Sequence, residues 1–267
     1  MADYIEGRRA VEEALRAGVK IRRAFVAEGP SRGAAHEADV TGGKGQGRDA
    51  GFARLVERLR AEGVEVESVD RSQLDRISQE GGSHGAHQGI VCEVPPYRYA
   101  DIGSIAYAGA TAPNALVLVL DHITDEGNLG AIIRTAEVVG ACGVVIPSKR
   151  AAQVTVGVYK TSAGAAFHIP IACVPNLVGA LETLKEAGFW VAGASEKATQ
   201  TIWEAPMYGR LALVCGSEGE GISRLVGETC DFFVSLPQHG HVGSLNVAQA
   251  TTAICYEWMR QCAAGRG

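Results

Sequence analysis

The chain has 267 residues, a formal net charge of −5, 46% hydrophobic residues and a mean hydropathy of +0.05. This length can form one large or two modest domains with a buried core. No apolar run approaches the ~20 residues that span a bilayer, so we expect no membrane partner. The N-terminal sequence has acidic residues and no apolar signal core, which predicts a cytoplasmic location. The negative net charge argues against a protein that binds nucleic acid through its overall charge.

The first hundred residues alternate between helical and extended patterns. Periodicity predicts helices at 8–17, 53–62 and 70–77 and strands at 23–27, 64–69 and 90–94. The segment 31–51 is rich in glycine and charge without periodicity, so we expect a flexible insertion there. A basic cluster near the N-terminus either contacts phosphates or is a solvated face; it comprises Arg8, Arg9, Arg16, Lys20, Arg22 and Arg23.

A boundary follows at 95–114, which is rich in proline and small residues and suits a linker with one short helix. The chain then becomes regular, with strands expected at 116–120, 143–146, 190–193, 211–215 and 232–236 and helices at 129–139, 177–187 and 247–260. The wholly apolar run at 116–120 is typical of a strand buried on both faces. This alternation predicts an α/β fold with a parallel sheet and helices on both faces.

The cysteines and histidines give no metal signature. There are seven cysteines, none in a CxxC pair and most within apolar runs, so we interpret them as small buried hydrophobes rather than disulfides or zinc ligands. His239 and His241 lie in a glycine-rich loop without a nearby partner, which indicates a polar loop. We therefore expect no metal.

Three loops follow predicted strands, at the edge where α/β proteins hold ligands. In the first, DHITDEGNLGAIIRTAE, Asp125 and Asn128 are candidate N-caps of a helix that starts at residue 129. Asn128 and Arg134 are six residues apart, or about 600° on a helix, so they converge only if Asn128 lies in the entering loop. The alternative for Arg134 is a surface ion pair with Glu137.

The second and third loops add glycines and polar side chains. CGSEGEGIS has the glycine order G-x-x-G-x-G, which is not the dinucleotide fingerprint and disfavours a nicotinamide-dependent oxidoreductase. In LPQHGHVGSLN, Ser244 and Asn246 either cap the last helix or meet a ligand. Each loop alone is weak evidence, but all three are expected on one edge of one sheet.

These residues resemble a known family. NLGAIIRTA, LVCGSEGEGIS and LPQHGHVGSLNVAQATTAICYE are similar, in order and spacing, to the three motifs of SpoU-type (TrmH-like) RNA 2′-O-ribose methyltransferases of the SPOUT superfamily. YIEGRRAVEEAL and HQGIVCEV resemble the small L30e-like substrate-binding domain of the ribosomal RNA enzymes of this family. The resemblance implies an L30e-like domain at 1–94, a linker at 95–114, and a methyltransferase domain with a deep trefoil knot at 115–267.

The resemblance also implies ligands and site residues. The cofactor would be S-adenosyl-L-methionine, the partner RNA, and the active form a homodimer with its site beside the interface. Cofactor-contacting positions match Gly216, Leu236 and Leu245. The polar positions around the reacting ribose match Asn128, Arg134, Glu218, Ser244 and Asn246. The sequence departs from the family at DEGN, which lacks the usual proline, and at Gln238, where methionine is usual.

The function implied is methylation of a ribose 2′-hydroxyl, with a guanosine of large-subunit ribosomal RNA as the favoured target because of the small domain. A transfer RNA target and a non-catalytic RNA-binding relative are the alternatives. The sulfonium methyl is already electrophilic, so the chemistry needs no metal. Since a guanidinium has a pKa above ~12, we interpret Arg134 as an anchor for the target phosphate rather than as the general base, which stays unidentified.

Overall fold

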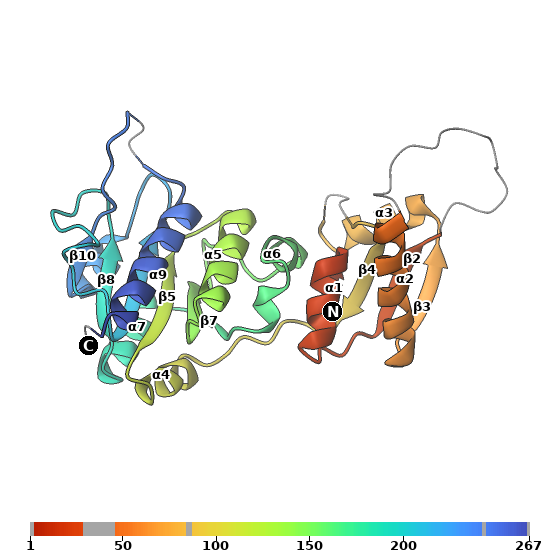
Figure 1. The fold of residues 1–267 in the computed structure, drawn as a ribbon, viewed down its shortest axis with the longest axis horizontal. Coiled ribbons are helices and arrows are strands. Elements are labelled where there is room, and N and C mark those ends of the chain that lie inside the picture. Colours follow the sequence, from red (N-terminus) through yellow and green to blue (C-terminus); the bar gives the residue numbers. More distant parts are fainter. Residues whose placement is uncertain (1–2, 29–45, 84–86, 242–243, 266–267) are drawn as a thin grey trace. The chain divides into compact units, whose positions relative to one another are not determined.

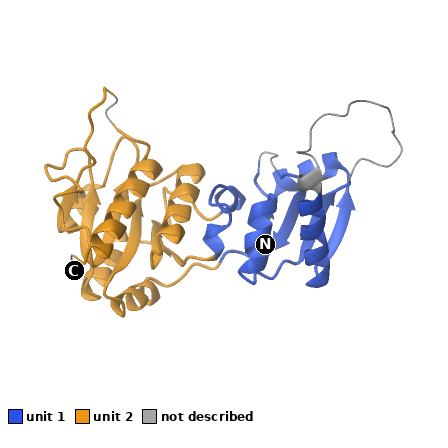
Figure 2. Cartoon of the chain, viewed as in Figure 1, with its two compact units in different colours: residues 1–97, 155–167 blue, residues 98–154, 168–267 orange. Residues whose placement is uncertain are grey.

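The computed structural model describes residues 3–28, 46–83, 87–241 and 244–265, and the chain divides into two compact units (Figure 2). Unit 1 consists of Met1–Tyr97 and Thr155–Phe167, and unit 2 of Arg98–Val154 and His168–Gly267. The chain therefore passes from one unit to the other three times.

No helix in the described ranges has both the length and the apolar character that a membrane span requires.

Unit 1 is built on a four-stranded sheet with the order β1-β4-β2-β3 (Figure 1). Its strands are β1 (Asp3–Glu6), β2 (Arg23–Ala27), β3 (Glu65–Val69) and β4 (Ile90–Val94). β4 runs antiparallel to β1 and β2, and β2 runs parallel to β3. β1 was not predicted, because four residues are too few for a period to be recognised.

The helices of unit 1 are α1 (Arg8–Arg16), α2 (Gln46–Ala61) and α3 (Arg71–Glu80). α2 corrects the predicted insertion at 31–51 and the helix expected from residue 53, because residues 46–51 are already helical. Gly47 and Gly51 lower the local helix propensity, but α2 packs against β3 and tertiary packing overrides propensity. Residues 31–45 lie outside the described residues.

Unit 1 also contains a segment from much later in the chain, α6 (Val156–Thr161) and the short 3-10 helix η1 (Ala165–Phe167). The buried Tyr159 ring stacks on Phe167 with centroids 4.5 Å apart and meets Tyr97 edge-on at 6.2 Å. Gly164, between them, has φ +87°, and a Cβ there would lie 2.4 Å from Glu13 Cβ, so only glycine fits. The segment is thus closely packed within unit 1.

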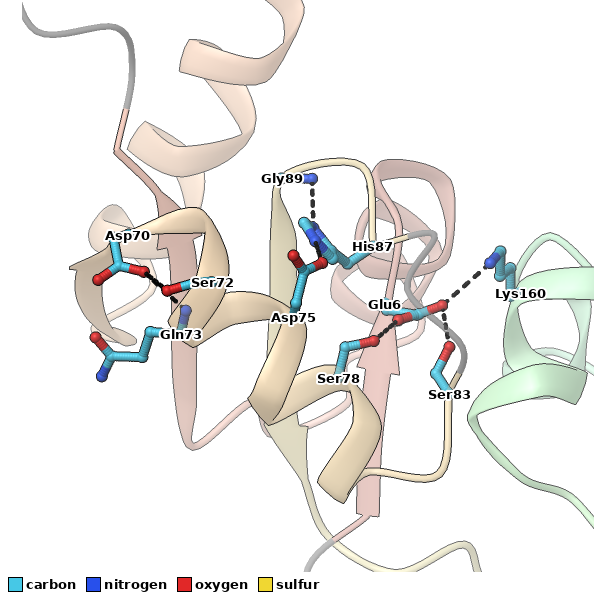
Figure 3. Close-up of polar contacts among 10 residues, drawn as sticks. All are labelled: Glu6, Asp70, Ser72, Gln73, Asp75, Ser78, Ser83, His87, Gly89 and Lys160. Atoms are coloured by element: carbon cyan, nitrogen blue, oxygen red, sulfur yellow. Dashed lines mark hydrogen bonds and ion pairs between the residues drawn. The ribbon is translucent and has the colours of Figure 1, made fainter.

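A buried carboxylate joins this segment to β1 (Figure 3). Glu6 is fully buried, and its oxygens accept hydrogen bonds from Ser78 Oγ at 2.6 Å, Ser83 Oγ at 2.5 Å and Lys160 Nζ at 3.1 Å. Burial raises the pKa of the Glu6 carboxyl, but the hydrogen bonds from the two serines and Lys160 outweigh burial and hold the pKa below its ordinary value. The charged form of Glu6 is therefore stabilised by folding.

The glycine- and histidine-rich segment 81–89 is anchored at both ends of residues 84–86, which lie outside the described residues. Ser83 binds Glu6 on one side, and His87 is buried on the other. His87 Nδ1 accepts from Gly89 N at 3.0 Å, so its proton is on Nε2, which donates to Asp75 at 2.9 Å (Figure 3). His87 thus has a structural role.

Unit 2 contains a six-stranded, wholly parallel sheet with the order β10-β8-β9-β5-β6-β7. Its strands are β5 (Ala115–Asp121), β6 (Gly143–Pro147), β7 (Ile171–Val174), β8 (Trp190–Ala194), β9 (Arg210–Gly216) and β10 (Phe232–Val234). The predicted parallel α/β sheet is confirmed. β7 was not predicted from the sequence.

Helices cover both faces of this sheet (Figure 1). They are α4 (Ile102–Ala110), α5 (Glu126–Val138), α7 (Leu177–Glu186), α8 (Arg224–Thr229) and α9 (Val247–Ala263). α4, α7 and α8 pack on alternate strand residues such as Val117 and Val214. α5 and α9 pack together on the other face, where Thr251 Oγ1 donates to Cys215 Sγ at 3.2 Å.

The structure bears on the expected linker and on the expected burial of the cysteines. The expected linker at 95–114 includes α4, whose Ile105 and Ala106 belong to the core, so this part of it is packed structure. All seven cysteines are free; Cys92, Cys215 and Cys255 are buried and the others half-buried. Burial raises the pKa of the Cys215 thiol to about 11, which keeps it protonated and unreactive at neutral pH.

Removal of the Glu6 charge tests the buried cluster. The lowered pKa means that the folded state binds this proton less tightly than the unfolded state. Stability from Glu6 is therefore present above its ordinary pKa of 4.5 and is lost as the pH falls through the folded-state pKa. We expect Glu6→Gln to lower the free energy of unfolding at neutral pH by about 1–3 kcal/mol, and this difference to shrink under acid.

Urea unfolding at several pH values measures the effect. Glu80→Gln is the control, because Glu80 is exposed on α3 and loses the same charge. An equal, pH-independent loss in both variants would contradict the stabilising role of Glu6.

Candidate active site

The three loops meet at the carboxyl edge of the sheet in unit 2, and a buried aspartate links the first two. Asp121 ends β5, is fully buried and pairs in register with Gly216 at the end of β9. Its Oδ2 accepts from Ser223 N at 2.6 Å, and its Oδ1 is 2.5 Å from His122 Nδ1. One carboxylate thus fixes the loop after β9 against the loop after β5.

The loop after β9 is a tight turn that requires glycine. Ser217 and Gly221 exchange backbone hydrogen bonds of 3.1 and 3.0 Å, and Gly219 and Gly221 have φ values of +99° and +71°. A Cβ on Gly216 would lie 2.1 Å from the backbone carbon of Gly221, a distance that no side chain tolerates. The turn presents Glu218 at its exposed tip.

Three of the predicted polar residues form a hydrogen-bonded cluster. Glu218 Oε1 accepts from Asn246 Nδ2 at 2.8 Å and from Asn128 Nδ2 at 3.2 Å. Asn246 Nδ2 also donates to Asn128 Oδ1 at 2.8 Å, and Val247 N lies 3.3 Å from Glu218 Oε1. One residue from each of the three loop regions therefore converges, across sequence separations of 90 and 118 residues.

The start of α5 corrects the local prediction around Asn128. The helix begins at Glu126 rather than at residue 129, because Asp125 is the N-cap and its Oδ1 accepts from Asn128 N at 2.7 Å. Asn128 is consequently in the first helical turn and not in the entering loop. Its side chain reaches Glu218 and Asn246 from there, without Arg134.

Arg134 and Ser244 make no hydrogen bond to this cluster among the described residues. Both are exposed, and neither has a hydrogen bond or ion pair within the part of the chain that the structure describes. The alternative ion pair between Arg134 and Glu137 is not formed there either. Arg134 therefore retains its full set of donors.

The three predicted cofactor positions lie at or near the ends of β9 and β10 and before α9. Gly216 is the last residue of β9 and is half-buried, and Leu236 follows β10 and is also half-buried. Leu245, directly before the N-cap Asn246, is 49% exposed. Asn246 does cap α9, since its Oδ1 accepts from Ala248 N at 2.9 Å. Its amide nitrogen still donates to Asn128 and Glu218, so capping does not exclude Asn246 from the cluster.

Sequence reasoning missed Asp121 and Ser223. The signal was a carboxylate directly after a wholly apolar strand, a position where an unpaired charge would be strongly disfavoured. Its partner is a backbone N–H, which no residue pattern identifies.

Within the described ranges, no group of three or more His, Cys, Asp or Glu side chains is placed to hold a metal ion.

Two family models match the chain. The SpoU rRNA Methylase family model matches residues 115–256, and the model for RNA 2′-O ribose methyltransferase substrate binding matches residues 4–100. The chain therefore belongs to the SpoU rRNA methylase family and is an RNA methyltransferase.

Similar proteins span nearly the whole chain. A Bacillus subtilis (strain 168) protein named as a TrmH family tRNA/rRNA methyltransferase, YacO, is 38% identical over 261 residues, or 97% of this chain and 96% of that protein. A Staphylococcus saprophyticus protein with the same family name is 36% identical over 258 residues, or 96% and 95%.

Solved structures also align over both units. The SpoU methyltransferase AviRb from Streptomyces viridochromogenes has a TM-score of 0.75 and 25% identity, covering 99% of this chain and 91% of that chain. Its complex with the cofactor AdoMet has a TM-score of 0.72 and 25% identity, covering 97% and 89%.

Asp121→Ala tests the link between the first two loops. Loss of the acceptor leaves Ser223 N unpaired, so we expect faster amide hydrogen exchange throughout 217–223 and a free energy of unfolding lower by about 1–3 kcal/mol. Ser223→Ala is the matched control, because the bond uses the backbone and the serine side chain makes no capping hydrogen bond. Unchanged exchange in Asp121→Ala would show that the aspartate does not hold this loop.

Proposed function

We propose that this enzyme transfers a methyl group to a ribose 2′-hydroxyl of RNA, with a guanosine of large-subunit ribosomal RNA as the favoured target. The observation that carries the proposal is the convergence of Asn128, Glu218 and Asn246 at the edge of the parallel sheet. The match of residues 4–100 to a ribose methyltransferase substrate-binding model supports the 2′-hydroxyl as acceptor. Only RNA has this hydroxyl.

S-adenosylmethionine is the cofactor, and it supplies an electrophilic methyl group. The residues of this edge fit such a ligand. The turn after Gly216 brings backbone close to backbone with no side chain between, and Leu245 is 49% exposed although it is apolar, as suits a residue that covers a ligand. Gly216, Leu236 and Leu245 would hold the cofactor.

The proposed roles of the polar residues follow from their free atoms. Glu218 Oε1 is engaged by both asparagines, whereas Oε2 accepts no hydrogen bond within the described residues. In our proposal, Oε2 accepts the hydrogen bond of the 2′-hydroxyl and directs its oxygen towards the methyl group. Asn128 and Asn246 keep the carboxylate oriented. Ser244, which is exposed two residues before Asn246, contacts the ribose or the methionine part of the cofactor.

Arg134 is the proposed anchor for the target phosphate. It is exposed on α5 and has no ion pair among the described residues, so its planar set of donors is available to a bidentate ligand. Glu218 accepts hydrogen bonds from the two asparagines and none from Arg134 among the described residues. The arginine therefore acts on the substrate and not on the carboxylate.

A second copy of the chain is part of the proposal. Val138 is 58% exposed on α5, and Tyr256 and Met259 are 50% and 37% exposed on the neighbouring α9. The two helices are joined by a hydrogen bond of 2.8 Å between Thr135 and Thr252. Exposed apolar side chains on adjacent helices are typical of an interface, which supports a homodimer. Sedimentation equilibrium decides between monomer and dimer.

Two finer features of the fold are also proposed, namely a deep trefoil knot in the C-terminal segment and an L30e-like fold for unit 1. Two contacts support the knot. Ser235 forms a parallel bridge with Thr201 and donates its N–H to Gln200 O, and farther along the chain Asn246 donates to Glu218. For unit 1, the support is the mixed sheet with α1, α2 and α3 packed on it.

Glu218→Gln tests the proposed chemistry. The amide has nearly the same shape but lacks the negative charge, so we expect the rate of tritium transfer from labelled S-adenosylmethionine to unmodified ribosomal RNA to fall by about 100-fold. Binding of S-adenosylhomocysteine, measured by calorimetry, should change little. Glu220→Gln is the control, because Glu220 is exposed on the same turn and loses the same charge. If the wild-type enzyme labels transfer RNA alone, the chemistry stands and the target changes. Equal rates in Glu218→Gln and Glu220→Gln would show that Glu218 has no role in the mechanism.

Arg134→Lys tests the anchor. Lysine keeps the charge but cannot form two parallel hydrogen bonds to one phosphate. The loss of one charged hydrogen bond costs about 1.5–3 kcal/mol, so we expect kcat/KM for RNA to fall about 10–100-fold. Steady-state kinetics with varied RNA measures the effect. Full turnover in Arg134→Lys would exclude bidentate anchoring.

A further inference from the structure

The loop after β6 runs beside the candidate active site. β6 is the parallel neighbour of β5, with Val119 opposite Val145, so both strands end at the same edge. Beyond that edge, Ala152 N donates to Ile123 O at 2.8 Å. The loop 148–152 is therefore fixed alongside the chain that connects β5 to α5 and leads to Asn128.

This loop is held in one conformation by the Gln153 side chain. Gln153 Nε2 lies 3.0 Å from Pro147 O, 3.3 Å from Ala151 O and 3.3 Å from Ala152 O, so one amide spans both ends of the loop. Gln153 Oε1 is itself fixed by Cys173 Sγ at 3.2 Å. These hydrogen bonds restrict the loop to one backbone conformation, so its exposed side chains start from fixed positions.

The two side chains that it presents are cations. Lys149 and Arg150 are exposed, and neither has a hydrogen bond or ion pair within the described ranges. Arg150 has φ +57°, a conformation that glycine adopts far more readily than arginine. A strained residue in a well-supported loop beside a site points to a role for its side chain.

No carboxylate within the described ranges forms an ion pair with Lys149 or Arg150. Asp121 is buried and bound to Ser223 N, Asp125 caps α5, and Glu218 is bound to the two asparagines. The positive charges of Lys149 and Arg150 are therefore available to a ligand from outside.

The basic cluster that the sequence singled out in unit 1 is, by contrast, mostly engaged. Arg16, Arg22 and Arg23 form ion pairs with Glu13, Glu93 and Glu65, respectively. Arg8 donates to Gln88 O at 3.3 Å and lies over the Phe52 ring at 4.3 Å. Three of its six cations are paired with glutamates of the same unit, which weakens the cluster as a phosphate-binding surface.

We propose that Lys149 and Arg150 bind backbone phosphates of the substrate RNA next to the target ribose. Lysine provides a compact charge and arginine a planar set of donors, and both suit phosphate oxygens. The contacts are to the backbone, so they position the RNA without reading its sequence. This inference rests on the proposed function, because it assigns a binding surface to the RNA of that reaction.

The test is the salt dependence of RNA binding by the full-length protein. Fluorescence anisotropy with unmodified ribosomal RNA and transfer RNA transcripts gives the slope of log affinity against log salt. For Lys149→Gln/Arg150→Gln we expect a slope reduced by about 2, about 1 per lost phosphate contact, and weaker binding to both RNAs. The affinity for S-adenosylhomocysteine should not change.

Two further variants separate charge from structure. Lys185→Gln is the matched control for charge, because Lys185 is paired with Asp231 at 2.6 Å, and it should leave the slope unchanged. Arg150→Gly removes the charge but also the backbone strain. We expect it to reduce the slope by about 1 while the melting temperature stays equal or rises.

The inference is overturned if the double variant keeps the wild-type slope, or if Lys185→Gln reduces the slope equally. A parallel loss of S-adenosylhomocysteine binding would also overturn it, since the loop would then be supporting the cofactor site. Methyl transfer by the wild-type enzyme is measured separately. If the variants show the predicted slope changes but the wild type methylates no ribose, the proposed function fails and the phosphate contacts stand.

Discussion

The parallel pairing of β5 with β9 is the constraint on which the site depends. It places Asp121 opposite Gly216, so two strand ends that are distant in sequence share one edge. The buried Asp121 carboxylate then needs a partner, which Ser223 N supplies. That bond fixes the turn whose tip carries Glu218, and Glu218 accepts hydrogen bonds from Asn128 and Asn246. The polar cluster is thus a consequence of strand register and of one buried charge.

Both units contain basic side chains that are paired with carboxylates, and unit 2 also has three exposed cations without an ion pair beside or near the candidate site. Many basic side chains of unit 1 are paired with glutamates, and one lysine, Lys160, is used to stabilise the buried Glu6. In unit 2, Arg134, Lys149 and Arg150 are exposed and have no ion pair in the described part of the chain. A protein with a net charge of −5 can therefore still offer local positive charge to RNA, which the overall composition does not reveal.

Sequence patterns predicted elements whose burial is uniform and missed those that depend on distant partners. The run at 116–120 is buried on both faces and was correctly predicted as a strand, whereas α6 packs within unit 1 and follows no local signal. The three loops were expected on one edge, but Asn128 was expected in the entering loop and lies instead in the first turn of α5, which starts three residues earlier than predicted. Motif resemblance named the candidate site residues, and only the fold showed which of them are hydrogen-bonded to one another.

The most direct test of the central claim is the position of the transferred methyl group. RNA labelled by the wild-type enzyme from tritiated S-adenosylmethionine is digested with alkali, which requires a free 2′-hydroxyl to cleave each phosphodiester bond. Methylation of the ribose predicts that the label is recovered in alkali-resistant dinucleotides. Label recovered in mononucleotides would place the methyl group on a base and contradict the account of how Glu218 and its neighbours act.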